Sequence, residues 1–283
     1  MNWFILAVTA SLFLAFYGIL SKVLATNSKD VRSFSVLYYA TASVICLLLI
    51  LFEEDKTFVK SFSSNILILT IISALVWGVF GKLEFISRKY IEASVAAIVF
   101  KIAPVVTLFL SIIWLDEGID LNKIVALILI LAANVMIFYN TSKIKLNKGL
   151  ILTVICAVFL GLGWTIDKVV ADSYSLGFYS FIGFISPSLL NLFIPNIDSK
   201  NLIKEIKSVN WFLMFILAFA NTLGYYLMIK AFILGEVSKV TLIISSADVI
   251  TILMGIIFLK ERKNIFLKIV AGLMVFIGTL LLS

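Results

Sequence analysis

Long apolar stretches separated by short polar links dominate the chain. A helix that crosses a bilayer needs about 20 predominantly apolar residues. Ten stretches of roughly that length predict helices at 3–24, 33–52, 65–87, 92–115, 121–139, 149–170, 175–195, 211–233, 237–259 and 265–282. Because these runs lack the alternation of a membrane β-barrel, the pattern predicts an all-α integral membrane protein with ten transmembrane helices.

The composition supports the same class. Hydrophobic residues make up 62% of the 283-residue chain and charged residues only 14%, whereas about a quarter of a soluble domain is charged. This excludes a soluble enzyme and predicts a multi-pass protein of the cell membrane. Cys46 and Cys156 lie within apolar stretches, which is typical of small buried side chains and implies no disulfide framework.

Signatures of catalysis are missing from the sequence. The chain has no histidine, which excludes histidine-ligated zinc and Ser-His-Asp chemistry. It has no phosphate-binding glycine loop and no metal-ligand spacing, so we expect neither an enzyme nor a cofactor. The formal net charge of +7 is expected to reflect loop topology and contact with anionic lipid, not nucleic acid.

The second half of the chain repeats features of the first. A shift of 144 residues places Leu115-Asp116-Glu117 on Leu259-Lys260-Glu261, and a shift of 146 places Lys22-Val23 on Lys168-Val169. Several such matches in chain order, polar ones included, are hard to obtain by chance. They predict two related segments.

The predicted segments, 1–140 and 149–283, hold five helices each. Two similar halves with an odd number of helices must face opposite sides of the membrane, which makes an inverted repeat. Secondary transporters often use this plan, with the substrate near the midplane between the halves. The alternative is a duplicated membrane scaffold that transports nothing.

The chain resembles EamA-type transporters of the drug/metabolite transporter superfamily. The residues that carry the resemblance are Ala93–Tyr139 with Pro104 and Leu115-Asp116-Glu117, Gly163-Trp164 with Lys168, and Gly235–Leu282 with Leu259-Lys260-Glu261-Arg262 and Gly272. The resemblance implies ten helices and movement of small metabolites, often amino acids, by exchange or ion-coupled transport. Two positions depart from the family pattern: Tyr17-Gly18 stands where Trp-Gly is expected, and Asp248 occupies the repeat position of Pro104.

Charged residues inside predicted spans are the main chemical candidates. Lys101 lies within the stretch 92–115 and Asp248 at the middle of 237–259. A charge at membrane depth costs several kcal/mol, roughly 2.5–3.5 on insertion scales, and normally faces a cavity or a partner. Lys101 could bind a carboxylate or phosphate, and Asp248 an amine or a coupling proton. Alternatively, the two side chains pair with each other and only set the packing.

Aromatic and polar side chains in the spans form a second group of candidates. They could line a cavity and bind the substrate, or they could only pack between helices; they are Tyr17, Trp77, Trp164, Asn221, Tyr225 and Ser245. Pro104 should break a backbone hydrogen bond and kink its helix, which could serve gating or be a fixed bend.

Other charges lie nearer the predicted helix ends. Lys82, Lys168 and Lys230 are expected to extend toward the headgroups. Glu84 lies two residues after Lys82, on another helix face, and Asp167 closes its span beside Lys168. No binding role follows from these positions alone.

These observations predict a secondary transporter, an exporter or exchanger, for a small amino-acid-like metabolite, with proton coupling possible and a monomer or homodimer in the bilayer. The alternatives are a flippase for a lipid-linked or phosphorylated headgroup and a non-transporting scaffold or sensor subunit. The orientation stays open. Lys and Arg concentrate in the links after odd-numbered helices, which places both termini outside, whereas the resemblance implies termini inside.

Overall fold

A computed structural model of the chain describes residues 2–53, 57–90, 96, 99–139, 148–193, 197–245, 247 and 265–281. These residues form helices joined by short links. In chain order the elements are α1 (Trp3–Asn27), α2 (Val31–Ile50), α3 (Ser64–Tyr90), α5 (Ile102–Trp114), α6 (Leu121–Tyr139), α7 (Lys148–Val170), the 3-10 turn η1 (Ala171–Ser173), α8 (Leu176–Phe193), α9 (Ser199–Ser208), α10 (Trp211–Leu234), α11 (Val237–Ile244) and α13 (Ile265–Leu280).

Six helices are long and apolar enough to cross a membrane, which confirms that part of the prediction. They are Trp3–Asn27, Val31–Ile50, Ser64–Arg88, Lys148–Ser173, Leu176–Phe193 and Trp211–Leu234. Shorter apolar helices lie at Ile102–Trp114, Leu121–Ala133 and Ile269–Gly278.

Polar residues fix where several helices begin. The side chains of Asn2, Asp30, Asp198 and Asn210 accept hydrogen bonds from first-turn backbone N–H groups of α1, α2, α9 and α10. Such caps satisfy donors that have no partner within the helix. The cap at Asp198 begins α9, a helix within the stretch 196–210 that we expected to be only a link.

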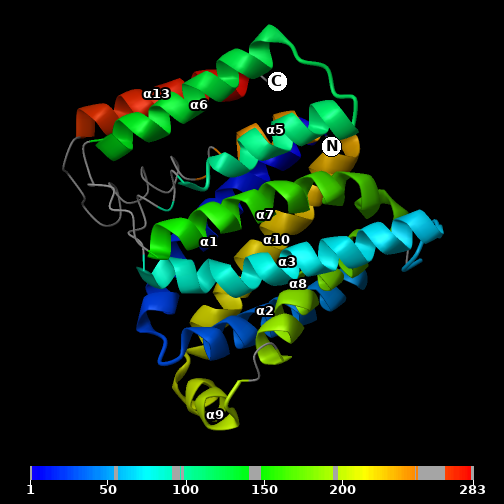
Figure 1. Ribbon diagram of the computed structural model, residues 1–283, viewed down its shortest axis with the longest axis vertical. Coiled ribbons are helices and arrows are strands. Elements are labelled where there is room, and N and C mark those ends of the chain that lie inside the picture. Colours follow the sequence, from blue (N-terminus) through cyan, green and yellow to red (C-terminus); the bar gives the residue numbers. More distant parts are fainter. Residues whose placement is uncertain are drawn as a thin grey trace.

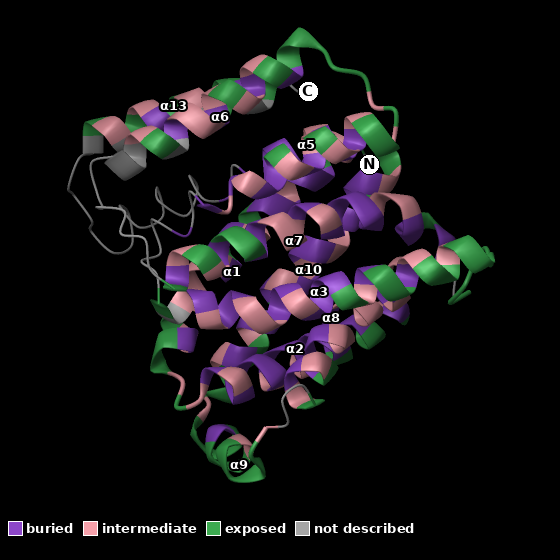
Figure 2. Ribbon diagram, viewed as in Figure 1, coloured by how far each residue is buried: buried purple, intermediate pink, exposed green. Residues whose placement is uncertain are grey.

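The long helices pack side by side in pairs. α1 lies along α10, α3 along α7 and α2 along α8, while α5 packs on α7. In Figure 1 these elements form the main bundle, and α6 and α13 form a separate pair at one edge of it. Figure 2 shows buried residues concentrated within the main bundle, and mostly exposed ones on α9.

The helix that we expected over 92–115 is interrupted. Phe100 and Lys101 form a turn, and α5 begins at Ile102. Pro104 therefore lies in the first turn of α5, where a backbone N–H has no partner within the helix in any case. The predicted proline kink inside a continuous helix is wrong, because the interruption comes before the proline.

Gly161 allows α7 to approach α5 closely. A Cβ atom at this position would lie 2.6 Å from the backbone oxygen of Ala103 and 2.8 Å from the Val106 side chain. We expect Gly161→Ala to lower the free energy of unfolding in detergent by about 1–3 kcal/mol through overpacking. Gly118→Ala is the matched control, because no atom lies within 4 Å of its Cβ position. Equal unfolding midpoints for the two variants would contradict the close approach.

Candidate functional site

The carboxylate of Asp167, a residue of α7, lies deep in the bundle, and Asp167 is 0% exposed. Its Oδ1 atom accepts hydrogen bonds from Tyr179 Oη (2.6 Å), Trp77 Nε1 (3.0 Å) and Ser73 Oγ (3.3 Å). Its Oδ2 atom accepts one from Tyr225 Oη at 2.8 Å. Helices α3, α7, α8 and α10 thus converge on one carboxyl group, which we call the Asp167 centre.

The donors of the Asp167 centre are all neutral. Two phenols, an indole and a hydroxyl satisfy both oxygens, and no basic side chain hydrogen-bonds them in the described part of the chain. A buried charge is normally paired as well as hydrogen-bonded, because removing it from water is costly. The carboxylate of the Asp167 centre could therefore bind one cationic group.

A second carboxylate, Glu84 of α3, has a different environment. Tyr17 Oη donates to Oε1 and Tyr39 Oη to Oε2, both at 2.7 Å. Arg88, one turn further along α3, binds Oε1 with its Nη2 atom at 2.8 Å. Glu84 is 2% exposed, and its charge is compensated within the protein. These residues form the Glu84 centre.

A row of aromatic rings links the two centres. Tyr39 of the Glu84 centre packs near Phe184, with ring centroids 6.2 Å apart. Phe184 packs edge-on against Tyr225 at 5.4 Å, and Tyr225 against Trp77 at 5.4 Å. Helix α3 contributes to both centres, through Trp77 and Glu84. Their seven-residue separation corresponds to a rise of about 10 Å along the helix.

Lys101 lies at the interrupted helix, 4% exposed. Its Nζ atom donates to the backbone oxygen of Ser245, the residue that caps the C-terminus of α11. The last carbonyls of a helix lack partners within it and carry partial negative charge. The lysine therefore meets a natural acceptor, between the start of α5 and the end of α11.

The remaining candidates from the sequence do not hydrogen-bond Asp167 in the described part of the chain. Asn221 Nδ2 donates to Tyr38 Oη, whose ring stacks on Tyr17. Trp164 packs in the hydrophobic core, 7% exposed. Asp248 lies outside the described residues, so its predicted pairing with Lys101 stays a prediction.

Sequence reasoning missed both carboxylates as partners of the candidate aromatic residues. Trp77 and Tyr225 were among the candidates and both contact Asp167, whereas Tyr39 and Tyr179 were not among them. Lys168, expected to reach the headgroups, instead donates to the backbone oxygens of Phe232 and Gly235. No periodicity marks these contacts, since each joins residues far apart in sequence.

The Leu115-Asp116-Glu117 motif has a definite structural task. After α5 ends, Asp116 adopts a positive φ of 52°, which turns the chain as at many helix C-termini. Glu117 then accepts hydrogen bonds from the backbone N–H groups of Val237 (2.7 Å) and Ser238 (3.2 Å) at the start of α11. The motif thereby connects the end of α5 to the start of α11, at the end of α5 opposite to Lys101.

A pocket of about 420 Å³ opens beside the contact between Glu117 and the start of α11. It is lined by Trp3, Leu115, Glu117, Lys168, Ile233, Leu234, Gly235, Glu236 and Lys239. Glu236 pairs with Lys123 and, at 3.7 Å, with Lys239. Acidic and basic groups are balanced here, at the end of the bundle where α10 finishes and α11 begins.

Two comparisons with known proteins point to a transporter, and a third finds a similar fold. The model of the EamA-like transporter family matches the chain twice, over residues 1–139 and 147–283. An uncharacterized transporter of Archaeoglobus fulgidus is 27% identical over 279 residues, which cover 98% of this chain and 96% of that protein. A protein of known crystal structure, 13% identical, has a similar fold with a TM-score of 0.76, over 99% of this chain and 95% of that one.

Proposed function

Because the chain belongs to the EamA-like transporter family, we propose that this multi-pass membrane transporter carries a small ammonium-bearing, amino-acid-like metabolite and that Asp167 binds the ammonium group. The observation that carries the proposal is the buried carboxylate with four neutral donors and no hydrogen-bonded cation among the described residues.

The surroundings of Asp167 suit an organic cation. Trp77 and Tyr225 lie edge-to-face beside the carboxylate, and aromatic faces attract ammonium groups within about 6 Å. An entering ammonium could replace the hydroxyl donors, which are free to turn toward each other or toward the substrate. A proton could neutralise the same carboxylate when no substrate is bound, which would couple transport to proton movement.

Lys101 adds a positive charge at another point of the proposed pathway, at the opposite end of α5 from the pocket that Lys168 lines. Its present partner is a backbone carbonyl, and a substrate carboxylate would be a stronger acceptor, since charge-assisted hydrogen bonds are roughly twice as strong as neutral ones. Asp248 is retained as a second carboxylate of the same pathway, and Pro104, beside Lys101, as a gating residue.

An inverted repeat would let the two halves expose this region alternately. The helix packing supports an inverted repeat, because α1 lies along α10 just as its counterpart α7 lies along α3.

Single contacts repeat between the two halves as well. Lys22 Nζ donates to the backbone oxygen of Arg88 (2.7 Å), and Lys168 Nζ to that of Phe232, the positions that the sequence shifts of 146 and 144 residues relate. Lys101 also meets Ser245, its own counterpart.

The proposal is tested with purified protein in detergent and in proteoliposomes. A panel contains amino acids, the corresponding amines, the corresponding deaminated acids and phosphorylated headgroups. A ligand that binds only the folded state raises the thermal midpoint by mass action. We expect compounds with an ammonium group to raise the midpoint and to drive exchange of a labelled counterpart. Stabilisation and flux by phosphorylated headgroups alone would overturn the proposal in favour of a flippase.

A further inference from the structure

Helix α9 lies outside the main bundle and is fixed to it by one buried acidic residue. Glu205 is 2% exposed. Its Oε2 atom accepts hydrogen bonds from the backbone N–H groups of Lys29 (3.0 Å) and Asp30 (2.9 Å), in the link between α1 and α2. The helix is therefore held against the end of the bundle in a defined orientation, with its other side chains free to face outward.

The outward side of α9 combines basic and apolar residues. Lys200, Lys204 and Lys207 are exposed, and the exposed Ile203 (51%) lies among them at helical spacing. Trp211, also exposed, follows at the start of α10 and donates its Nε1 hydrogen to the Ile206 backbone oxygen. Basic residues around an apolar one, with a tryptophan at the boundary, are typical of helices that lie in the membrane interface.

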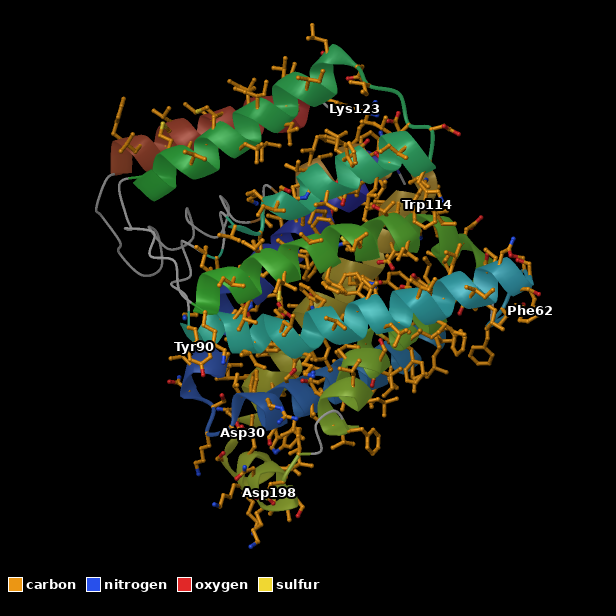
Figure 3. All side chains as sticks on the ribbon, in the orientation of Figure 1. Asp30, Phe62, Tyr90, Trp114, Lys123 and Asp198 are labelled. Atoms are coloured by element: carbon orange, nitrogen blue, oxygen red, sulfur yellow. The ribbon has the colours of Figure 1, made fainter. Side chains whose placement is uncertain are left out.

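The two ends of the bundle differ in charge. In Figure 3, Tyr90, Asp30 and Asp198 lie along one side of the molecule, and Lys123, Trp114 and Phe62 along the opposite side. Described residues near the first side are mostly basic: Lys22, Lys29, Arg32, Lys82, Arg88, Lys148, Lys200, Lys204 and Lys207, against Asp30, Glu84, Asp198 and Glu205. Those near the second side are balanced: Lys60, Lys123, Lys168, Lys230 and Lys239, against Glu53, Asp116, Glu117, Asp120, Asp172 and Glu236.

We infer that α9 is an interfacial helix whose Lys200, Lys204 and Lys207 bind anionic phospholipid headgroups of the cytoplasmic leaflet. The cytoplasmic leaflet attracts basic segments next to membrane spans, and cytoplasmic links are enriched in Lys and Arg. The inference decides between the two orientations left open by the sequence: the end with α9 faces the cytoplasm and the start of α1, at the opposite end, lies outside, as the charge count predicts and against the expectation from the family resemblance. It does not depend on the identity of the substrate.

Lipid binding is measured with the full chain in nanodiscs of phosphatidylcholine, with and without phosphatidylglycerol, by counting the lipids that stay bound in native mass spectrometry. We expect preferential retention of phosphatidylglycerol, and Lys204→Gln/Lys207→Gln should weaken it by about fivefold for each lysine removed. The matched control is Lys60→Gln/Lys230→Gln, which removes two exposed lysines from the opposite end. Equal losses in the two variants would overturn the inference.

Orientation is measured by cysteine labelling in intact cells. The native Cys46 and Cys156 are both 0% exposed, so a membrane-impermeant maleimide should report only an introduced thiol. We expect Lys60→Cys to be labelled in intact cells and Lys207→Cys only after permeabilisation. The reverse pattern would overturn the assignment of α9 to the cytoplasmic leaflet, and so would labelling of both variants in intact cells.

Discussion

Asp167→Asn is expected to reduce exchange of an ammonium-bearing substrate in proteoliposomes by about 100-fold, because it removes the only charge of the Asp167 centre that the substrate would meet. A hydrogen bond to a charged group contributes up to about 3 kcal/mol, and each 1.4 kcal/mol corresponds to a factor of ten in binding. The measurement is the initial rate of labelled-substrate uptake at equal amounts of reconstituted protein.

The substitution should leave the fold intact. The amide oxygen can still accept from Trp77 Nε1, and the amide nitrogen can donate to the Tyr225 hydroxyl, which accepts as readily as it donates. Asp172→Asn is the matched control, since Asp172 is exposed five residues further along the chain and should exchange at the parent rate. Full exchange by Asp167→Asn, or equal losses in both variants, would remove Asp167 from the transport pathway.

Much of the fold was predictable because membrane helices leave a strong local signal. Apolar runs of sufficient length give six of the spans, and the Leu115-Asp116-Glu117 repeat pointed to a residue, Glu117, that caps another helix. The interruption at Lys101 was not predicted, because a proline in an apolar run is consistent both with a kinked helix and with a helix start.

The site was harder to predict because its contacts are tertiary. Asp167 stands next to Lys168 near the end of a predicted span, a position typical of charged side chains that reach the headgroup region. Only the packing of α3, α8 and α10 over it buries the carboxylate and gives it Tyr179 and Tyr225 as donors. Trp77 and Tyr225 were selected as aromatic candidates for a cavity, and the signal that would have joined them to Asp167 is absent from the sequence.

Glu84→Gln is expected to act on stability, in contrast to Asp167→Asn. Arg88 would lose its carboxylate partner while its guanidinium stays largely buried, with 16% of the side chain exposed. Removing one partner of a buried ion pair typically costs about 3–5 kcal/mol, whereas replacing both by apolar groups is often neutral. The free energy of unfolding is measured in detergent by denaturant titration.

A double-mutant cycle separates the pair from its surroundings. Glu84→Gln/Arg88→Met should recover much of the stability lost in Glu84→Gln, because both members of the ion pair are then neutral. The Met side chain would pack between Tyr17 and Phe100, whose rings lie 5.6 and 5.8 Å from the guanidinium carbon. Additive losses would mean that the ion pair contributes no coupling energy of its own and that Glu84 stabilises the fold through its other contacts, those with Tyr17 and Tyr39 among them. The contrast follows from charge: Glu84 is paired with Arg88 within the protein, whereas the hydrogen-bond donors of Asp167 among the described residues are neutral and our proposal assigns its cation to the substrate.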